Sequence, residues 1–173
     1  MLECLLASAW RDTTRLAEIV IAKEPPFGGV VTCVFQVDLA CLGLKWAFVS
    51  QFHSRREYEE PFRALMVARC DLIPVEFGLV AKVLREALRY GRLLGFEPPP
   101  KVTSTLSALG PIDQAASGCR VEVPLGGPDG RPLYMAGPED DSDAILATLT
   151  RTCGQGNFAC AVPDSPFPPG FFA

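Results

Sequence analysis

Two charged residues lie in the longest apolar region of the chain, and their side chains could do chemistry. The stretch QVDLACLGLK, from Gln36 to Lys45, holds Asp38 among apolar neighbours. A carboxylate there could bind a divalent ion or act as a general base, while the lysine stabilises developing negative charge. Alternatively, Asp38 caps a short helix by accepting from the amides of Ala40 or Cys41, with Lys45 near the end of that helix. We favour the structural role and keep the catalytic one open.

Cys41 and His53 are the other candidates for catalysis. His53 is the only histidine in the chain, so any serine–histidine or cysteine–histidine mechanism must use it. Neither a G-x-S-x-G elbow nor a catalytic-cysteine signature accompanies it. A metal-dependent phosphoesterase or nuclease built on Asp38 would need further carboxylates. The acidic residues that could converge with it are Glu57, Glu59, Glu60, Glu76 and Asp141.

Two segments are candidates for binding. A basic stripe with helical spacing could bind nucleic acid, although Glu86 interrupts it. It consists of Lys82, Arg85, Arg89 and Arg92. The tail SPFPPGFFA carries Phe167, Phe171 and Phe172 on a proline-stiffened segment. Such a segment loses little conformational entropy on docking, so it could bind a partner protein, a second copy of the chain or the core of its own domain.

Composition restricts the class of protein. With 173 residues, 49% of them hydrophobic, and a net charge of −4, the chain predicts one folded domain without general attraction to nucleic acid or anionic lipid. The charged residues inside the apolar region disfavour a membrane span. Seven cysteines lack C-x-x-C spacing, so we expect free thiols, no metal and no cofactor. Without a basic segment ahead of its apolar start, the chain is expected in the cytoplasm.

The first half of the chain predicts a hairpin followed by helices. Residues 15–23 and 30–37 read as two strands joined at a Pro–Gly break. Ser54 and Glu57 form a capping box that begins a helix, which Pro61 should kink. A second, long amphipathic helix is expected to open at Asp71 and to end before Gly95.

The second half predicts a short helix at 101–109, a loop at 110–118 and a hairpin of residues 119–124 and 132–136. A helix should follow the acidic residues 139–143, and a last strand should cover 157–162. The order ββ-αα-ββ-α-β indicates an α+β fold with an antiparallel or mixed sheet of about five strands and helices packed on one face. We expect one domain over 1–162 and a proline- and phenylalanine-rich tail over 163–173.

Four pieces of the sequence together carry a resemblance. They are FQVDLACLGLK at 35–45, the run of residues 70–96, GPDGRPLYMAGPEDD at 127–141 and GNF at 156–158. The chain resembles an uncharacterised family of small bacterial proteins with a V-D-x-x-C-L-G-x-K-like core and a long Ala-rich helix ending in L-G-F. The resemblance spans residues 3–162, implies one domain, and implies no activity. Trp46 departs from it, because the family pattern more often has a carboxylate there.

The leading functional hypothesis is a non-catalytic cytosolic protein that acts through a protein partner or a homo-oligomer. The tail phenylalanines and one sheet or helix face would form its contact surface. The alternatives are a metal-dependent phosphoesterase or nuclease that uses Asp38 and Lys45, and a nucleic-acid-binding accessory protein that uses the basic stripe.

Overall fold

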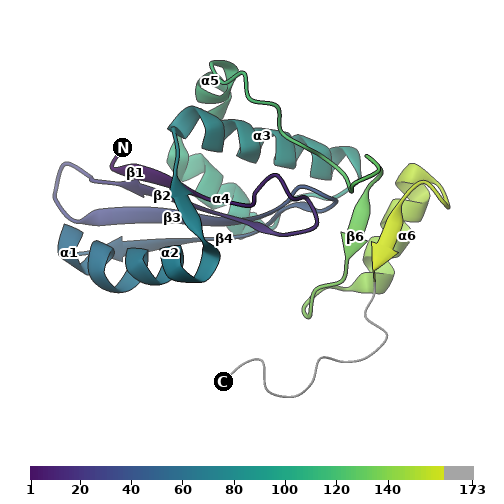
Figure 1. Cartoon of the computed structure of the whole chain (residues 1–173), viewed down its shortest axis with the longest axis horizontal. Coiled ribbons are helices and arrows are strands. Elements are labelled where there is room, and N and C mark those ends of the chain that lie inside the picture. The colour runs from purple at the N-terminus through teal and green to yellow at the C-terminus, as the bar shows by residue number, and fades with distance from the viewer. Residues whose placement is uncertain (162–173) are drawn as a thin grey trace.

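Five strands form the central sheet in the computed structural model, which describes residues 1–161 (Figure 1). Their order is β4-β3-β2-β1-β5, and all neighbours are antiparallel. The bounds are β1 (Glu3–Ala7), β2 (Ala17–Lys23), β3 (Val30–Asp38), β4 (Gly43–Phe52) and β5 (Leu72–Pro74). The expected α+β class, the five-stranded antiparallel sheet and the single domain are confirmed.

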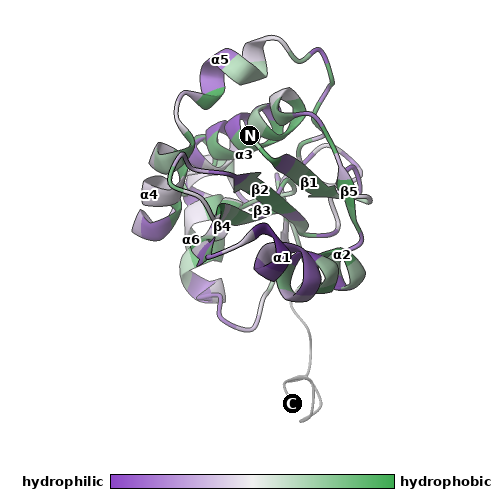
Figure 2. Cartoon of the chain, turned by 90° about the vertical axis from the view of Figure 1, so that its left-hand side faces the viewer, coloured by the Kyte–Doolittle hydropathy of each residue, from purple (hydrophilic) through white to green (hydrophobic). Residues whose placement is uncertain are grey.

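Helices cover parts of both faces of this sheet, where the sequence had suggested one (Figures 1 and 2). One face carries α1 (Arg55–Glu57), the π-helical turn η1 (Tyr58–Arg63) and α2 (Ala64–Cys70), and the ring of Phe62 packs on Phe52 there. The opposite face carries α3 (Phe77–Leu93) and α4 (Pro100–Leu109). The central strands are therefore buried on both sides, which explains why most positions of β2 and β3 are apolar and buried.

The chain leaves β3 through a tight turn, which corrects the short helix expected after Asp38. Residues 39–42 form the turn, and β4 then pairs back along β3. Gly43 has a φ of +74°, a left-handed conformation that ends any helical path and that glycine adopts without strain. Asp38 thus accepts from the amides of Ala40 and Cys41 as predicted, but these amides belong to the turn of residues 39–42 and not to a helix.

The capping box at Ser54 does begin a helix, since its hydroxyl accepts from the amide of Glu57. Pro61 lies inside the π-helical turn η1, so the expected irregularity is present. Asp71, however, does not open the long helix. It follows α2 with a φ of 49°, and residues 72–74 then add β5 to the edge of the sheet, a place that tolerates Pro74.

The segment before residue 137 also differs from expectation. Residues 110–118 include a helix, α5 (Ile112–Ser117), and residues 119–124 form no strand. The expected hairpin is therefore wrong, because backbone donors of this segment bond to the β3–β4 turn. The amide of Gly126 donates to the carbonyl of Leu39 at 2.9 Å, and that of Leu133 donates to Ala40 at 3.0 Å.

A small second layer completes the fold. β6 (Leu133–Met135) pairs in parallel with β7 (Ala159–Ala161), and α6 (Ser142–Cys153) connects them. Their side chains and the β3–β4 turn share a cluster around four buried residues, Cys41, Leu94, Tyr134 and Leu149. This cluster is separate from the main core under α3. Within residues 1–161, no helix combines the length and the apolar character that crossing a membrane requires.

Candidate functional site

Asp38 is engaged by the backbone of the turn that follows it. Its Oδ1 accepts from the amides of Ala40 at 2.9 Å and Cys41 at 3.0 Å, and its Oδ2 accepts from Leu42 at 3.1 Å. The residue is 5% exposed, and this burial raises the pKa of its carboxyl although the three amides oppose the shift. Both oxygens therefore hold the turn closed.

Lys45 pairs with Asp140, which sequence reasoning did not single out. The ammonium Nζ lies 2.9 Å from Oδ1 and 3.0 Å from Oδ2 of Asp140, and both side chains are mostly buried. The amide of Gly137 also donates to Oδ2, at 2.9 Å. The ion pair thus connects β4 to the segment before α6, and only the acidic run at 139–143 hinted at it.

Asp38 and Lys45, the residues of the catalytic alternative, therefore both have internal partners. A metal-dependent site needs two or more free carboxylates facing one ion. Among residues 1–161, no three histidine, cysteine, aspartate or glutamate side chains gather where an ion could bind. Two of the carboxylates that could have converged with Asp38 make other contacts. Asp141 caps α6 by accepting from the amide of Ala144 at 3.1 Å, and Glu57 accepts from the amide of His53 at 2.8 Å.

Cys41 and His53 do not meet. Cys41 lies in the turn before β4 and His53 follows the far end of that strand, so the ten-residue strand separates them by about 30 Å at ~3.3 Å per residue. Burial, followed by the nearby Asp38, strongly raises the pKa of the Cys41 thiol, and the thiolate needed of a nucleophile is disfavoured. The geometry therefore forms no cysteine–histidine pair from them.

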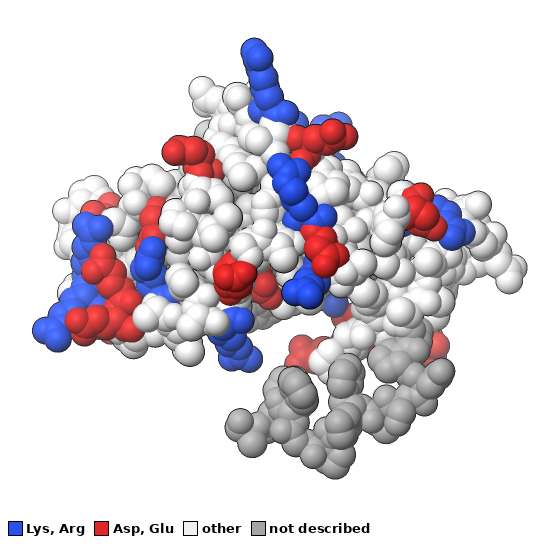
Figure 3. Space-filling model, in the orientation of Figure 1, with Lys and Arg blue, Asp and Glu red and all other residues white. Residues whose placement is uncertain are grey.

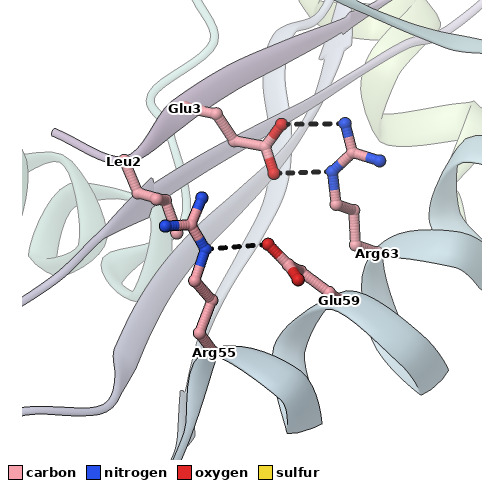
Figure 4. Close-up of a pocket in the computed structure, with 5 residues that line it drawn as sticks. All are labelled: Leu2, Glu3, Arg55, Glu59 and Arg63. Atoms are coloured by element: carbon pink, nitrogen blue, oxygen red, sulfur yellow. Dashed lines mark hydrogen bonds and ion pairs between the residues drawn. The ribbon is translucent and has the colours of Figure 1, made fainter.

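A cavity of about 390 Å³ lies between the start of β1 and the α1–η1 turn (Figure 4). Glu3 points toward Arg63 and accepts two hydrogen bonds from it, at 2.7 and 3.0 Å. Across the cavity, Arg55 donates to Glu59 at 2.8 Å. The four charges that line the cavity thus satisfy one another, and this arrangement favours a structural junction over a site for a charged ligand.

The outer face of α3 presents the basic stripe expected from the sequence. Arg85 pairs with Glu86 at 2.8 Å, and Arg92 pairs with Glu97 at 3.0 Å. Lys82 is 3.7 Å from the same Glu86. For Arg89, which is exposed, residues 1–161 provide no carboxylate within ion-pair distance.

Two hollows flank this stripe, and both are lined by Arg89 and Arg92. The first, of about 580 Å³, also involves Tyr90, Leu93 and Leu125. The second, of about 480 Å³, lies toward α4 and α5 and is lined in addition by Arg85, Leu88, Leu106, Ser107, Gly110, Pro111, Ile112 and Asp113. The apolar lining comes from segments distant in sequence, so periodicity alone could not reveal it.

Some surface charges on other parts of the molecule are paired, whereas the exposed Arg69, Lys101 and Arg151 are in no ion pair among residues 1–161. Figure 3 shows basic and acidic side chains close together over α1, where Arg55–Glu59 and Arg56–Glu60 are ion pairs. Much of the remaining face in that view is uncharged. The binding candidates Phe167, Phe171 and Phe172 lie outside the described residues.

Comparison with known proteins assigns neither a family nor a function to the chain. No protein-family model matches the chain, and no curated protein or solved structure is significantly similar to it. The resemblance to a family with a V-D-x-x-C-L-G-x-K-like core therefore stays a prediction.

Proposed function

We propose that this chain is a non-catalytic protein that acts by binding another protein, and that the outer face of α3 is its contact surface. The observation that carries the proposal is the pair of hollows that share Arg89 and Arg92. Leu93, which lines one of them, is 73% exposed at the end of a well-formed amphipathic helix. Protein contact surfaces are enriched in arginine and have an apolar centre, and the hollows combine both features.

The engagement of Asp38 and Lys45 in the fold supports binding over catalysis. Each of these side chains has an internal partner that stabilises a turn or joins two segments. The exposed Arg89, by contrast, contributes to no internal ion pair among residues 1–161 and is available to a partner.

The cytoplasm is the location that we propose. Cys4, Cys33 and Cys41 are buried in the apolar clusters, where they pack as small hydrophobic side chains. Reduced, buried cysteines of this kind are typical of proteins from reducing compartments.

A charge reversal on α3 tests the proposal. Tagged wild-type protein, Arg89→Glu and Arg56→Glu would be used to capture partners from cells that produce the chain, with quantitative mass spectrometry as the readout. Arg56 is a matched control because its side chain is 82% exposed and lies on α1, on the opposite face of the sheet. We expect a protein that wild type and Arg56→Glu retain and that Arg89→Glu loses. Identical captures by all three proteins would refute α3 as the contact surface.

A further inference from the structure

We propose that the α3 face binds an acidic segment of its partner, in which carboxylates flank an aliphatic or aromatic side chain. This inference rests on the proposed function and specifies the chemistry of the partner. The carboxylates would pair with Arg89 and its neighbours on α3, and the apolar side chain would enter the hollow beside Leu93 and Leu125.

The charges of the face support an acidic ligand. Arg85, Arg89 and Arg92 are spaced four and three residues apart on α3, so their side chains follow one another along the same helical face. Lys82 extends the row. Glu86 pairs with Lys82 and Arg85, Glu97 pairs with Arg92, and Arg89 is in no ion pair among residues 1–161. Asp113 also lines the second hollow, so four cations face three carboxylates and one positive charge is in excess, in a chain whose net charge is −4. This local excess favours a negatively charged partner.

The lining of the hollows supports an apolar component. Their volumes, about 580 and 480 Å³, fall within the range of roughly 300–1,000 Å³ that is common for ligand pockets. Leu93 and Leu125 line one, while Leu88 and Leu106 contribute to the other. A side chain such as leucine or phenylalanine would bury its surface there while an adjacent carboxylate reaches the guanidinium of Arg89.

The position of Glu86 favours a peptide over nucleic acid. This carboxylate bonds to Arg85 and lines the same hollow as Arg89. Nucleic-acid binding relies on successive contacts between cations and phosphates, and a carboxylate within the row repels the backbone that would follow it. A peptide can place its acidic residues on either side of Glu86.

Selection from random libraries provides the test. Phage-displayed random dodecapeptides would be selected on the wild-type chain, and the enriched peptides would then be measured against Arg89→Glu, Leu93→Asp and the control Arg56→Glu. We expect the enriched peptides to combine aspartate or glutamate with leucine or phenylalanine. Their affinity should fall about tenfold for Arg89→Glu, remain unchanged for Arg56→Glu, and weaken with added salt. In nuclear magnetic resonance titrations, amide signals of residues 85–93 and 125 should shift.

Other outcomes overturn the inference in distinguishable ways. Peptides without acidic enrichment, or peptides that bind Arg89→Glu equally, would refute the acidic chemistry, whereas a natural partner still lost on Arg89→Glu would leave the proposed function standing. A random single-stranded DNA pool that shifts the same signals, with affinity falling steeply as salt rises, would replace the peptide by nucleic acid. If no peptide is enriched and no natural partner depends on Arg89, both proposals fail.

Discussion

At the scale of single residues, the two charges of the apolar stretch are explained by different partners. Asp38 satisfies three backbone donors of the β3–β4 turn, and two of them would otherwise be buried without acceptors. Lys45 instead finds the carboxylate of Asp140, 95 positions away. The sequence could predict the first role, because capping is local. It could not predict the second, because the acidic run offered several equivalent carboxylates.

Replacing Asp38 should lower the stability of the fold, and we expect neither wild type nor the variant to be stabilised by Mg²⁺ or Mn²⁺. We expect Asp38→Ala to lower the free energy of unfolding by about 2 kcal/mol, because three backbone amides, two of them buried, lose a charged acceptor. Asp38→Asn should cost about 1 kcal/mol, since one amide oxygen remains as an acceptor. Urea denaturation followed by circular dichroism measures both values. Stabilisation of the wild type by Mg²⁺ or Mn²⁺ that disappears in Asp38→Ala would contradict the structural role and revive the phosphoesterase alternative.

Glu3 provides a pH-dependent contribution to stability. Its burial raises the pKa of the carboxyl, but hydrogen bonds from Arg63 and Tyr58 outweigh burial, so the folded-state pKa lies below its ordinary value of 4.5. A lowered carboxyl pKa stabilises the fold above the unfolded-state pKa, and the contribution disappears as pH falls through the folded-state pKa.

We therefore expect Glu3→Gln to be less stable than wild type at pH 7, by about 1–2 kcal/mol. The difference should shrink as pH falls below 4.5, the pKa of the unfolded carboxyl. Urea unfolding of both proteins across this range gives the difference at each pH. A gap that stays constant from pH 7 to acid conditions would show that the Glu3 charge contributes nothing to it.

At the scale of elements, the β3–β4 turn and α3 approach each other through two glycines. A Cβ added at Gly43 would lie 2.6 Å from the carbonyl oxygen of Ala87. A Cβ added at Gly91 would lie 2.9 Å from that of Leu42. The backbone of the β3–β4 turn therefore packs directly against the backbone of α3. This close packing, on the side of α3 that faces the turn, fixes the position of the basic stripe on its outer face.

Gly91→Ala tests this packing. Alanine in a helix interior normally gains up to about 1 kcal/mol over glycine, but the collision with the Leu42 carbonyl should reverse the sign and cost about 1–3 kcal/mol. Thermal unfolding monitored by circular dichroism measures the change. Gly118→Ala is the matched control, because its added Cβ would meet only the Ala115 carbonyl, at 3.9 Å. A Gly91→Ala protein as stable as wild type would show that the turn can retreat from α3.

The elements that the sequence predicted are those with local signals. The capping box at Ser54, the amphipathic pattern of α3 and the β2–β3 hairpin each depend on neighbouring residues. Three strands of the sheet, β1, β4 and β5, were not predicted. The three residues of β5 become a strand only by pairing with β1. The basic stripe of the candidate site was likewise visible, but its hollows were not, since Leu125 reaches α3 only through the tertiary fold.

At the scale of the whole molecule, the β3–β4 turn joins two apolar clusters. The larger one lies between the sheet and its helices, and the smaller one surrounds Cys41, Tyr134 and Leu149. The smaller cluster is held to the sheet by backbone bonds to Leu39 and Ala40 and by the Lys45–Asp140 pair. Since few long-range bonds secure it, we expect the segment from β6 to β7 to open more readily than the central strands.

Lys45→Met should loosen that segment selectively. The substitution leaves Asp140 with a mostly buried charge and without its cation, which should destabilise the docking of β6, α6 and β7 by about 1–2 kcal/mol. Hydrogen exchange measured by mass spectrometry should then be about tenfold faster in α6 and β7, while β2 and β3 keep their protection. Arg56→Met is the control, because the exposed Arg56–Glu60 pair should contribute less than about 0.5 kcal/mol. Equal loss of protection in β2 and β3 would mean that the two clusters unfold together, because the smaller one then cannot open without the sheet.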